Sequence, residues 1–130
     1  MEIEIVKKSN IGFSPEIGDM THELLSRLSE KVDSEGIDVL KKETVDILSK
    51  CTDPNKRECQ SVTNLVVGYV QSGKTMSFTT LSALAHDNGF RVIIYFAGTK
   101  NNLLSQTTKR LRKDLINGNV NSKHYKLFEN

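Results

Sequence analysis

The stretch GYVQSGKT, residues 68–75, decides the fold that this sequence predicts. It matches the phosphate-loop pattern GxxxxGK[ST] in full, with Gly68, Gly73, Lys74 and Thr75 at the specified positions. The two glycines let the backbone curl with its N–H groups pointing inward. Those groups and the positive end of a following helix can hold a β-phosphate. The stretch therefore predicts a nucleotide site.

Each side chain of this loop has its own expected role in binding the nucleotide and the metal ion. Lys74, the expected catalytic residue, places its ammonium group on the β- and γ-phosphates, and the Thr75 hydroxyl ligates Mg²⁺. Gln71 and Ser72 lie at the crown of the loop, where backbone donors matter more than side chains. The expected cofactors are ATP and Mg²⁺, although the pattern does not specify which nucleotide binds. A chance match is the competing interpretation.

Apolar segments on both sides of the loop predict an α/β fold. Residues 65–67 and 92–96 are short, apolar and rich in β-branched side chains, which favours buried strands. Helices are expected at about residues 74–87 and 102–115. Strand, helix, strand and helix in this order predict a βαβα unit with a parallel sheet, the first part of a RecA-like P-loop NTPase domain.

The first half of the chain predicts helices. The Ser-Pro-Glu sequence at residues 14–16 combines a capping hydroxyl, a first-turn proline and an acid, as at the start of a helix. A second helix is expected at about residues 37–50. We therefore expect a helical N-terminal segment at residues 1–60 and the P-loop NTPase part at residues 61–130.

The composition suits one domain with a packed core. The 130 residues are 37% hydrophobic and 26% charged, and no stretch approaches the roughly 20 apolar residues of a membrane span. The opening MEIEIVKK lacks a signal-peptide core, so a cytoplasmic location without a membrane partner is expected. Cys51 and Cys59 have no metal-ligand spacing and are expected to be reduced thiols.

The C-terminal part of the sequence is basic. From Thr99 onward there are seven Lys or Arg residues against two acidic residues, whereas the whole chain carries a net charge of only +2. This excess suggests a polyanion partner such as DNA. A solvated helix face would explain the same charges equally well.

A longer stretch, residues 68–111, reads GYVQSGKTMSFTTLSALAHDNGFRVIIYFAGTKNNLLSQTTKRL. Its distinctive parts are VQSGKT, the DNGF that ends the expected helix, the apolar RVIIYFAG, and NNLLSQT with a basic tail. These parts resemble the Z-one domain family of endonucleases, which are superfamily 2 helicase-like ATPases linked to bacterial restriction and phage defence. The resemblance covers about residues 64–112 and implies an ATP-dependent motor that acts on DNA.

The resemblance also implies roles for single residues. Gly73, Lys74 and Thr75 match helicase motif I. The residues at the position of motif Ia, which contacts the backbone of single-stranded DNA, are Thr99, Lys100, Asn101, Asn102 and Gln106. Asn and Thr side chains at a helix start also offer hydrogen-bond donors to phosphate. Plain helix capping by the asparagines and a surface position for the glutamine are the alternatives.

Several elements that a helicase of this superfamily requires are not recognised in the sequence. No strand ending in an acidic motif II follows Phe96, and neither arginine fingers nor nuclease residues are found. The resemblance therefore implies the N-terminal portion of a longer protein whose C-terminal part is a necessary partner. Such a portion is expected to bind nucleotide with little turnover. With its strands unpaired, it is also expected to self-associate or rearrange its sheet.

Two other functions remain open from the sequence. A small P-loop nucleotide or metabolite kinase would use the C-terminal Lys and Arg cluster as a partial lid over phosphate. A non-catalytic DNA-binding piece would keep the loop only for its fold.

Overall fold

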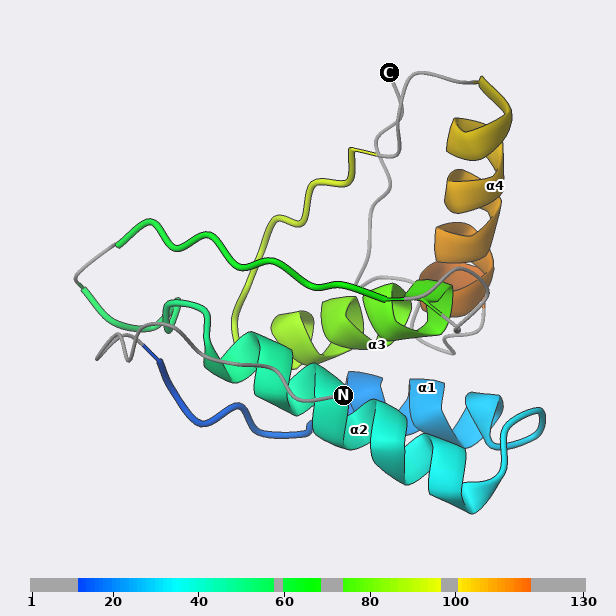
Figure 1. Ribbon diagram of the computed structural model, residues 1–130, viewed down its shortest axis with the longest axis horizontal. Helices are drawn as coiled ribbons and strands as arrows, with labels where there is room; N and C mark the ends of the chain where they lie inside the picture. The colour runs from blue at the N-terminus through cyan, green and yellow to red at the C-terminus, as the bar shows by residue number, and fades with distance from the viewer. Residues whose placement is uncertain (1–11, 58–59, 69–73, 97–100, 118–130) are drawn as a thin grey trace.

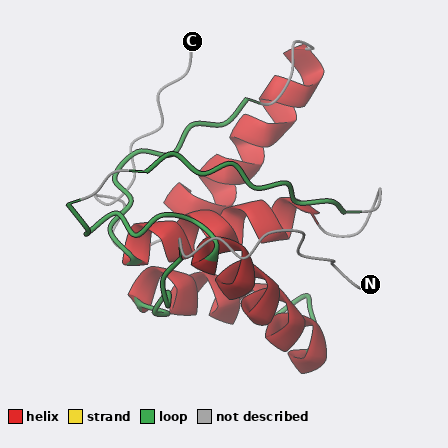
Figure 2. Ribbon diagram, turned by 60° about the vertical axis from the view of Figure 1, so that its left-hand side comes forward, coloured by secondary structure: helices red, strands yellow, loops and turns green. Residues whose placement is uncertain are grey.

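The computed structural model describes residues 12–57, 60–68, 74–96 and 101–117 (Figure 1). In chain order the elements are α1 (Asp19–Leu28), α2 (Ser34–Ser49), α3 (Lys74–Asp87), α4 (Asn101–Leu111) and a π-helical turn, η1 (Arg112–Asn117). Figure 2 shows these helices joined by irregular chain, with no strand in the part of the molecule that the structure describes.

Helix α3 is the centre of the packing. It packs against both α1 and α2, and η1 also contacts it. Its sequence, KTMSFTTLSALAHD, has no continuous polar face, as expected for a helix surrounded by others. Six of its residues are buried: Thr79, Thr80, Ser82, Ala83, Leu84 and Ala85.

Two apolar clusters hold the helices together. The first contains Leu24, Leu25, Leu28, Leu40, Ala83, Leu111 and Leu115, so it joins α1, α2, α3 and the α4–η1 segment. The second contains Leu48, Leu84 and Ala85, with Phe13, Ile17 and Phe90 among the residues packed against it. Burying one such leucine side chain stabilises a fold by about 1.5–3 kcal/mol. The clusters therefore account for much of the attraction between the helices.

The carboxylate of Asp87, the last residue of α3, caps the first turn of α1. It accepts hydrogen bonds from the backbone N–H groups of Gly18, Met20 and Thr21 at 3.1, 3.2 and 2.9 Å. The Thr21 hydroxyl donates to it at 2.6 Å. The N-cap residue of α1 is Gly18, which has no side chain to act as a cap. A Cβ atom at Gly18 would lie 2.7 Å from the Asp87 Cγ atom, so only glycine permits this approach.

The turn after α3 extends this junction. The Asn88 side chain accepts from the Glu16 N–H at 2.8 Å and donates to the carbonyl oxygens of Glu16 and Leu84 at 2.9 and 2.7 Å. Gly89 has a φ of 97°, which residues with a side chain rarely adopt. Phe90 then packs against the second apolar cluster. The DNGF sequence thus joins the end of α3 to the start of α1.

The parallel βαβα sheet of the predicted RecA-like fold is wrong for the described residues. Residues 60–68 and 91–96 have no regular secondary structure, and no backbone hydrogen bond outside the helices joins these two segments. Leu65 is 89% exposed and Phe96 is 95% exposed, so neither segment is a buried strand. Their composition favoured strands, but a strand also needs a hydrogen-bonded partner, and the described residues provide none.

Three expected helices are confirmed, with small shifts at their ends. The helix expected at residues 74–87 is α3, and the one expected at residues 37–50 is α2. The helix expected at residues 102–115 is α4, followed by the π-helical turn η1. Among the described residues, no helix is both long and apolar enough to cross a membrane.

The first expected helix is present as α1, but its expected start at residues 14–16 is wrong, because α1 begins at Asp19. Residues 12–18 lead into α1 without helical structure. The local capping signal is not used, since the first-turn N–H groups of α1 receive their acceptor from Asp87 instead.

We expect Asp87→Ala to lower the free energy of unfolding by about 2–3 kcal/mol, because three backbone donors and the buried Thr21 hydroxyl lose their acceptor. Urea unfolding followed by circular dichroism measures this. The control is Asp46→Ala, which removes an exposed carboxylate paired with Lys50 at 2.8 Å and should cost less than about 0.5 kcal/mol. Equal losses in the two variants would contradict the capping role.

The exposed apolar side chains predict self-association of the isolated chain. They are Leu65, Val66, Val67, Val92, Ile93, Ile94 and Phe96. Because exposed apolar surface favours association, light scattering should show oligomers whose size rises with concentration. Phe96→Ser should shift the distribution toward monomer, whereas Val39→Ser, at a 50% exposed position on α2, should not. A monodisperse monomer that melts cooperatively would contradict this prediction.

Candidate functional site

The candidate site is the phosphate loop in front of α3. Gly68 is the last described residue before it, and residues 69–73, which include Gln71, Ser72 and Gly73, lie outside the described residues. Lys74 and Thr75 form the start of α3, although the structure does not describe their side chains. The helix that the motif requires therefore begins at the motif lysine. The described residues that precede the loop, 60–68, form no strand.

The start of α3 has the electrostatic character that an anion site needs. The first N–H groups of a helix have no partner within the helix, and the helix dipole places partial positive charge there. The first turn of α3 contains no acidic residue that would oppose an anion. The helix terminus is thus suited to phosphate oxygens, with the motif lysine adding a full positive charge.

The chain leading into the loop is tied to the end of α2. Asn64 donates from Nδ2 to the Lys50 carbonyl oxygen at 3.3 Å, and the Thr52 hydroxyl donates to the Gln60 carbonyl oxygen at 2.8 Å. Asn64 also contacts the Cys51 Sγ atom at 3.7 Å. These contacts restrain the segment that leads into the loop from its N-terminal side.

The chain after α3 is tied back to the helix by two hydroxyl groups. The side chains of Ser82 and Tyr95 form a hydrogen bond, and the Ser82 hydroxyl lies 2.8 Å from the Phe78 carbonyl oxygen. Burial raises the pKa of Tyr95 above its usual value of 10.0, and the Ser82 hydrogen bond offsets part of this rise. Thr80 is fully buried, and its Oγ1 has no hydrogen-bond partner among the described residues. The hydrogen bond between Ser82 and Tyr95 therefore adds a polar contact to the apolar contacts that hold α3.

The predicted nucleic-acid residues are only partly described. Thr99 and Lys100 lie outside the described residues, whereas Asn101, Asn102 and Gln106 lie on the first half of α4 with exposed side chains. This half of α4 rises away from the layer formed by α1, α2 and α3 (Figure 1). The three amides are therefore accessible on one helix, and the structure does not bring them against the start of α3.

The described cysteine has the properties of a structural thiol. Cys51 is free, as the sequence predicted, whereas Cys59 lies outside the described residues. Burial raises the pKa of the Cys51 thiol, and the hydrogen bond from Asn64 offsets part of this rise. Less thiolate forms at neutral pH as a result, so Cys51 is a poor candidate nucleophile. Among the described residues, no group of three or more His, Cys, Asp or Glu residues could hold a metal ion.

Sequence reasoning missed the part played by Asp87. An acid at the end of a helix is unfavourable for the dipole of that helix, so its position was a signal of a partner elsewhere. Sequence reasoning also missed the Ser82–Tyr95 contact, for which the sequence offers no local signal because the residues belong to separate segments.

Comparisons with protein-family models, with curated proteins and with solved structures found no match for this chain. The resemblance to the Z-one domain family therefore rests on the short motifs of residues 68–111.

The raised pKa of Tyr95 predicts a loss of stability at alkaline pH. The folded chain holds the phenolic proton more tightly than the unfolded chain, so this contribution is complete below about pH 10 and is lost as the pH rises through the folded-state pKa. An absorbance titration should show one of the three tyrosines ionising above pH 10.0. Tyr95→Phe should remove that step, and an unchanged profile in this variant would contradict the assignment.

Proposed function

We propose that residues 68–75 bind the phosphates of ATP together with Mg²⁺. The observation that carries this proposal is the position of α3, which begins at Lys74 directly after a complete phosphate-loop sequence. Thr75 is the proposed ligand of Mg²⁺, and the backbone donors of Gly68 to Gly73 would surround the β-phosphate. The proposal requires the loop and the start of a helix, and it does not include the sheet that the sequence predicted.

The contacts of α3 support this assignment. Asp87 fixes the far end of the helix to α1, while the apolar clusters fix its sides. A helix fixed in this way holds its first N–H groups in one place, which favours phosphate binding at the start of α3.

We propose binding with little or no turnover in the isolated chain. Phosphoryl transfer relies on groups that neutralise charge and position water, commonly an acid near the metal and an arginine. Among the described residues, no group of three or more His, Cys, Asp or Glu residues could hold a metal ion. We propose that this chain captures the nucleotide and that a C-terminal part of the same protein supplies the remaining catalytic groups.

The wider role follows the family resemblance. We propose an ATP-binding portion of a DNA-directed, helicase-like enzyme of bacterial restriction or phage defence, located in the cytoplasm. The exposed amides of Asn101, Asn102 and Gln106 support the DNA part of this proposal, because amide groups can donate to phosphate oxygens. Thr99 and Lys100 belong to the same proposed contact.

Calorimetric titration with Mg²⁺ and ATP tests the phosphate site. Wild-type protein should bind, and Lys74→Ala should bind roughly tenfold or more weakly, because a charge-assisted contact to phosphate is lost. Lys56→Ala, which removes an exposed lysine outside the motif, should bind as the wild type does. Circular dichroism of both variants checks that they remain folded.

Four results would count against the proposal. Absence of binding by the wild type would refute the site, as would equal affinity of wild type and Lys74→Ala. Clear release of phosphate by the isolated chain would refute the claim that catalytic groups come from elsewhere. A DNA affinity that ignores both ATP and the Lys74 substitution would favour the non-catalytic DNA-binding function instead.

A further inference from the structure

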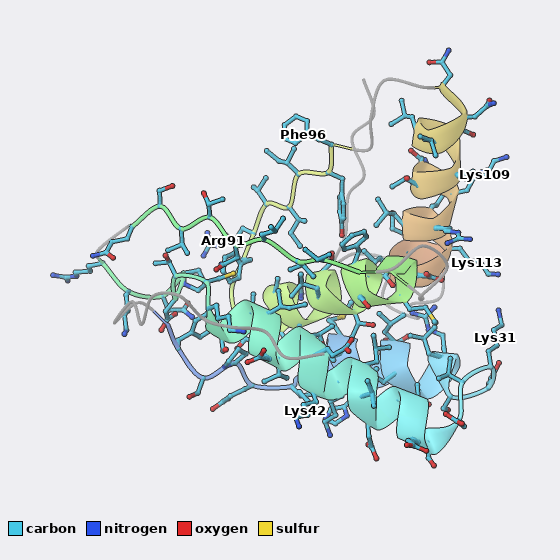
Figure 3. The ribbon with its side chains drawn as sticks, viewed as in Figure 1. Lys31, Lys42, Arg91, Phe96, Lys109 and Lys113 are labelled. Carbon is cyan, nitrogen blue, oxygen red and sulfur yellow. The ribbon has the colours of Figure 1, made fainter. Side chains whose placement is uncertain are left out.

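Exposed lysines from distant parts of the sequence lie on one side of the fold. Lys109 belongs to α4 and Lys113 to η1, about one helical turn further along. Lys31 belongs to the turn between α1 and α2. All three are exposed, and Figure 3 shows them on the same side of the molecule, with the Lys31 side chain extending toward η1.

A direct contact between α1 and η1 fixes this arrangement. Arg27, in the last turn of α1, donates from Nη2 to the carbonyl oxygen of Asp114 at 2.5 Å. Asp114 immediately follows Lys113 in η1. The turn after α1 is itself restrained, because the Lys31 N–H donates to the Leu28 carbonyl oxygen at 2.9 Å. The fold therefore holds Lys31 on the same side of the molecule as Lys113, although the two residues are far apart in the sequence (Figure 3).

The positive charge on this side is not neutralised by ion pairs. Lys31, Lys109 and Lys113 form no ion pair with any described residue, and neither does Arg27. The Nε atom of Arg27 is buried without a hydrogen-bond partner in the part of the chain that the structure describes. Glu23 lines the same small depression as Arg27 and Asp114, but it is not paired with Arg27. Because Glu23 and Asp114 line that depression as well, the guanidinium adds no net positive charge there, and the charge of this surface is that of the three lysines.

We propose that Lys31, Lys109 and Lys113 form a basic ridge that binds the phosphate backbone of nucleic acid. The ridge lies at the opposite end of α4 from Asn101 and Asn102, so it is a separate contact from the predicted one. It rests on the DNA-directed part of the proposed function and adds a surface that includes the N-terminal helices. The π-helical geometry of η1 is consistent with this role, because such turns are frequent at functional sites.

The burial of the neighbouring apolar side chains favours nucleic acid over a lipid surface. A helix that lies on a membrane inserts apolar side chains between its basic residues. On the ridge those side chains are Leu111 and Leu115, which are 7% and 8% exposed and belong to the first apolar cluster. Between the lysines the surface therefore offers charge without an exposed apolar side chain, as a polyanion in water requires, and the exposed Leu103 and Leu104 lie in the other half of α4.

Fluorescence anisotropy with a labelled oligothymidine over a series of salt concentrations tests the ridge. Lys31→Gln should raise the Kd about threefold to fivefold at low salt and reduce the slope of log Kd against log salt by about 0.7, because one phosphate contact is lost. Lys109→Gln should act similarly. The matched control is Lys42→Gln, an exposed lysine on α2 away from the ridge, which should leave both values unchanged (Figure 3).

Each outcome is decisive. Equal effects of Lys31→Gln and Lys42→Gln would overturn the ridge while leaving DNA binding intact. Failure of the wild type to bind the oligonucleotide would overturn both the ridge and the DNA part of the proposed function. Binding to phosphatidylserine vesicles in place of the oligonucleotide would overturn the choice of partner.

Discussion

The hydrogen bonds between the Asp87 carboxylate and the first turn of α1 join the end of α3 to the start of α1, and the packing of α1 against α3 depends on this junction. The negative charge is unfavourable at the end of its own helix, but it lies at the positive end of α1, where it is favourable. The favourable interaction of Asp87 with α1 thus offsets its unfavourable interaction with the dipole of α3. Gly18 and Asn88 complete the junction, the first by allowing close approach and the second by pairing with Glu16.

The two ends of α3 have different roles. Its first residues belong to the phosphate-loop motif, and its last residue holds the N-terminal helices. A single helix of 14 residues therefore connects the candidate nucleotide site with α1 and α2. The N-terminal helices, in which the sequence showed no recognisable motif, support the candidate site mechanically through this helix.

The fold also decides which basic residues lie near one another on the surface. Sequence alone left a solvated helix face and a polyanion site equally open. The contact between Arg27 and Asp114 adds a lysine from the N-terminal half to the lysines of α4 and η1. The burial of Leu111 and Leu115 then leaves charge as the dominant property of that surface.

The sequence by itself determined the features that depend on neighbouring residues. The phosphate-loop match and the existence of α2, α3 and α4 follow from residue order, because helix periodicity and end signals act over a few residues. Only the tertiary structure decided where α1 begins, since its cap comes from a residue 66 positions away. It also decided that residues 65–67 and 92–96 form no sheet, because a strand exists only when another segment supplies its hydrogen bonds. Pairing of that kind depends on distant residues, and no local pattern of apolar side chains can guarantee it.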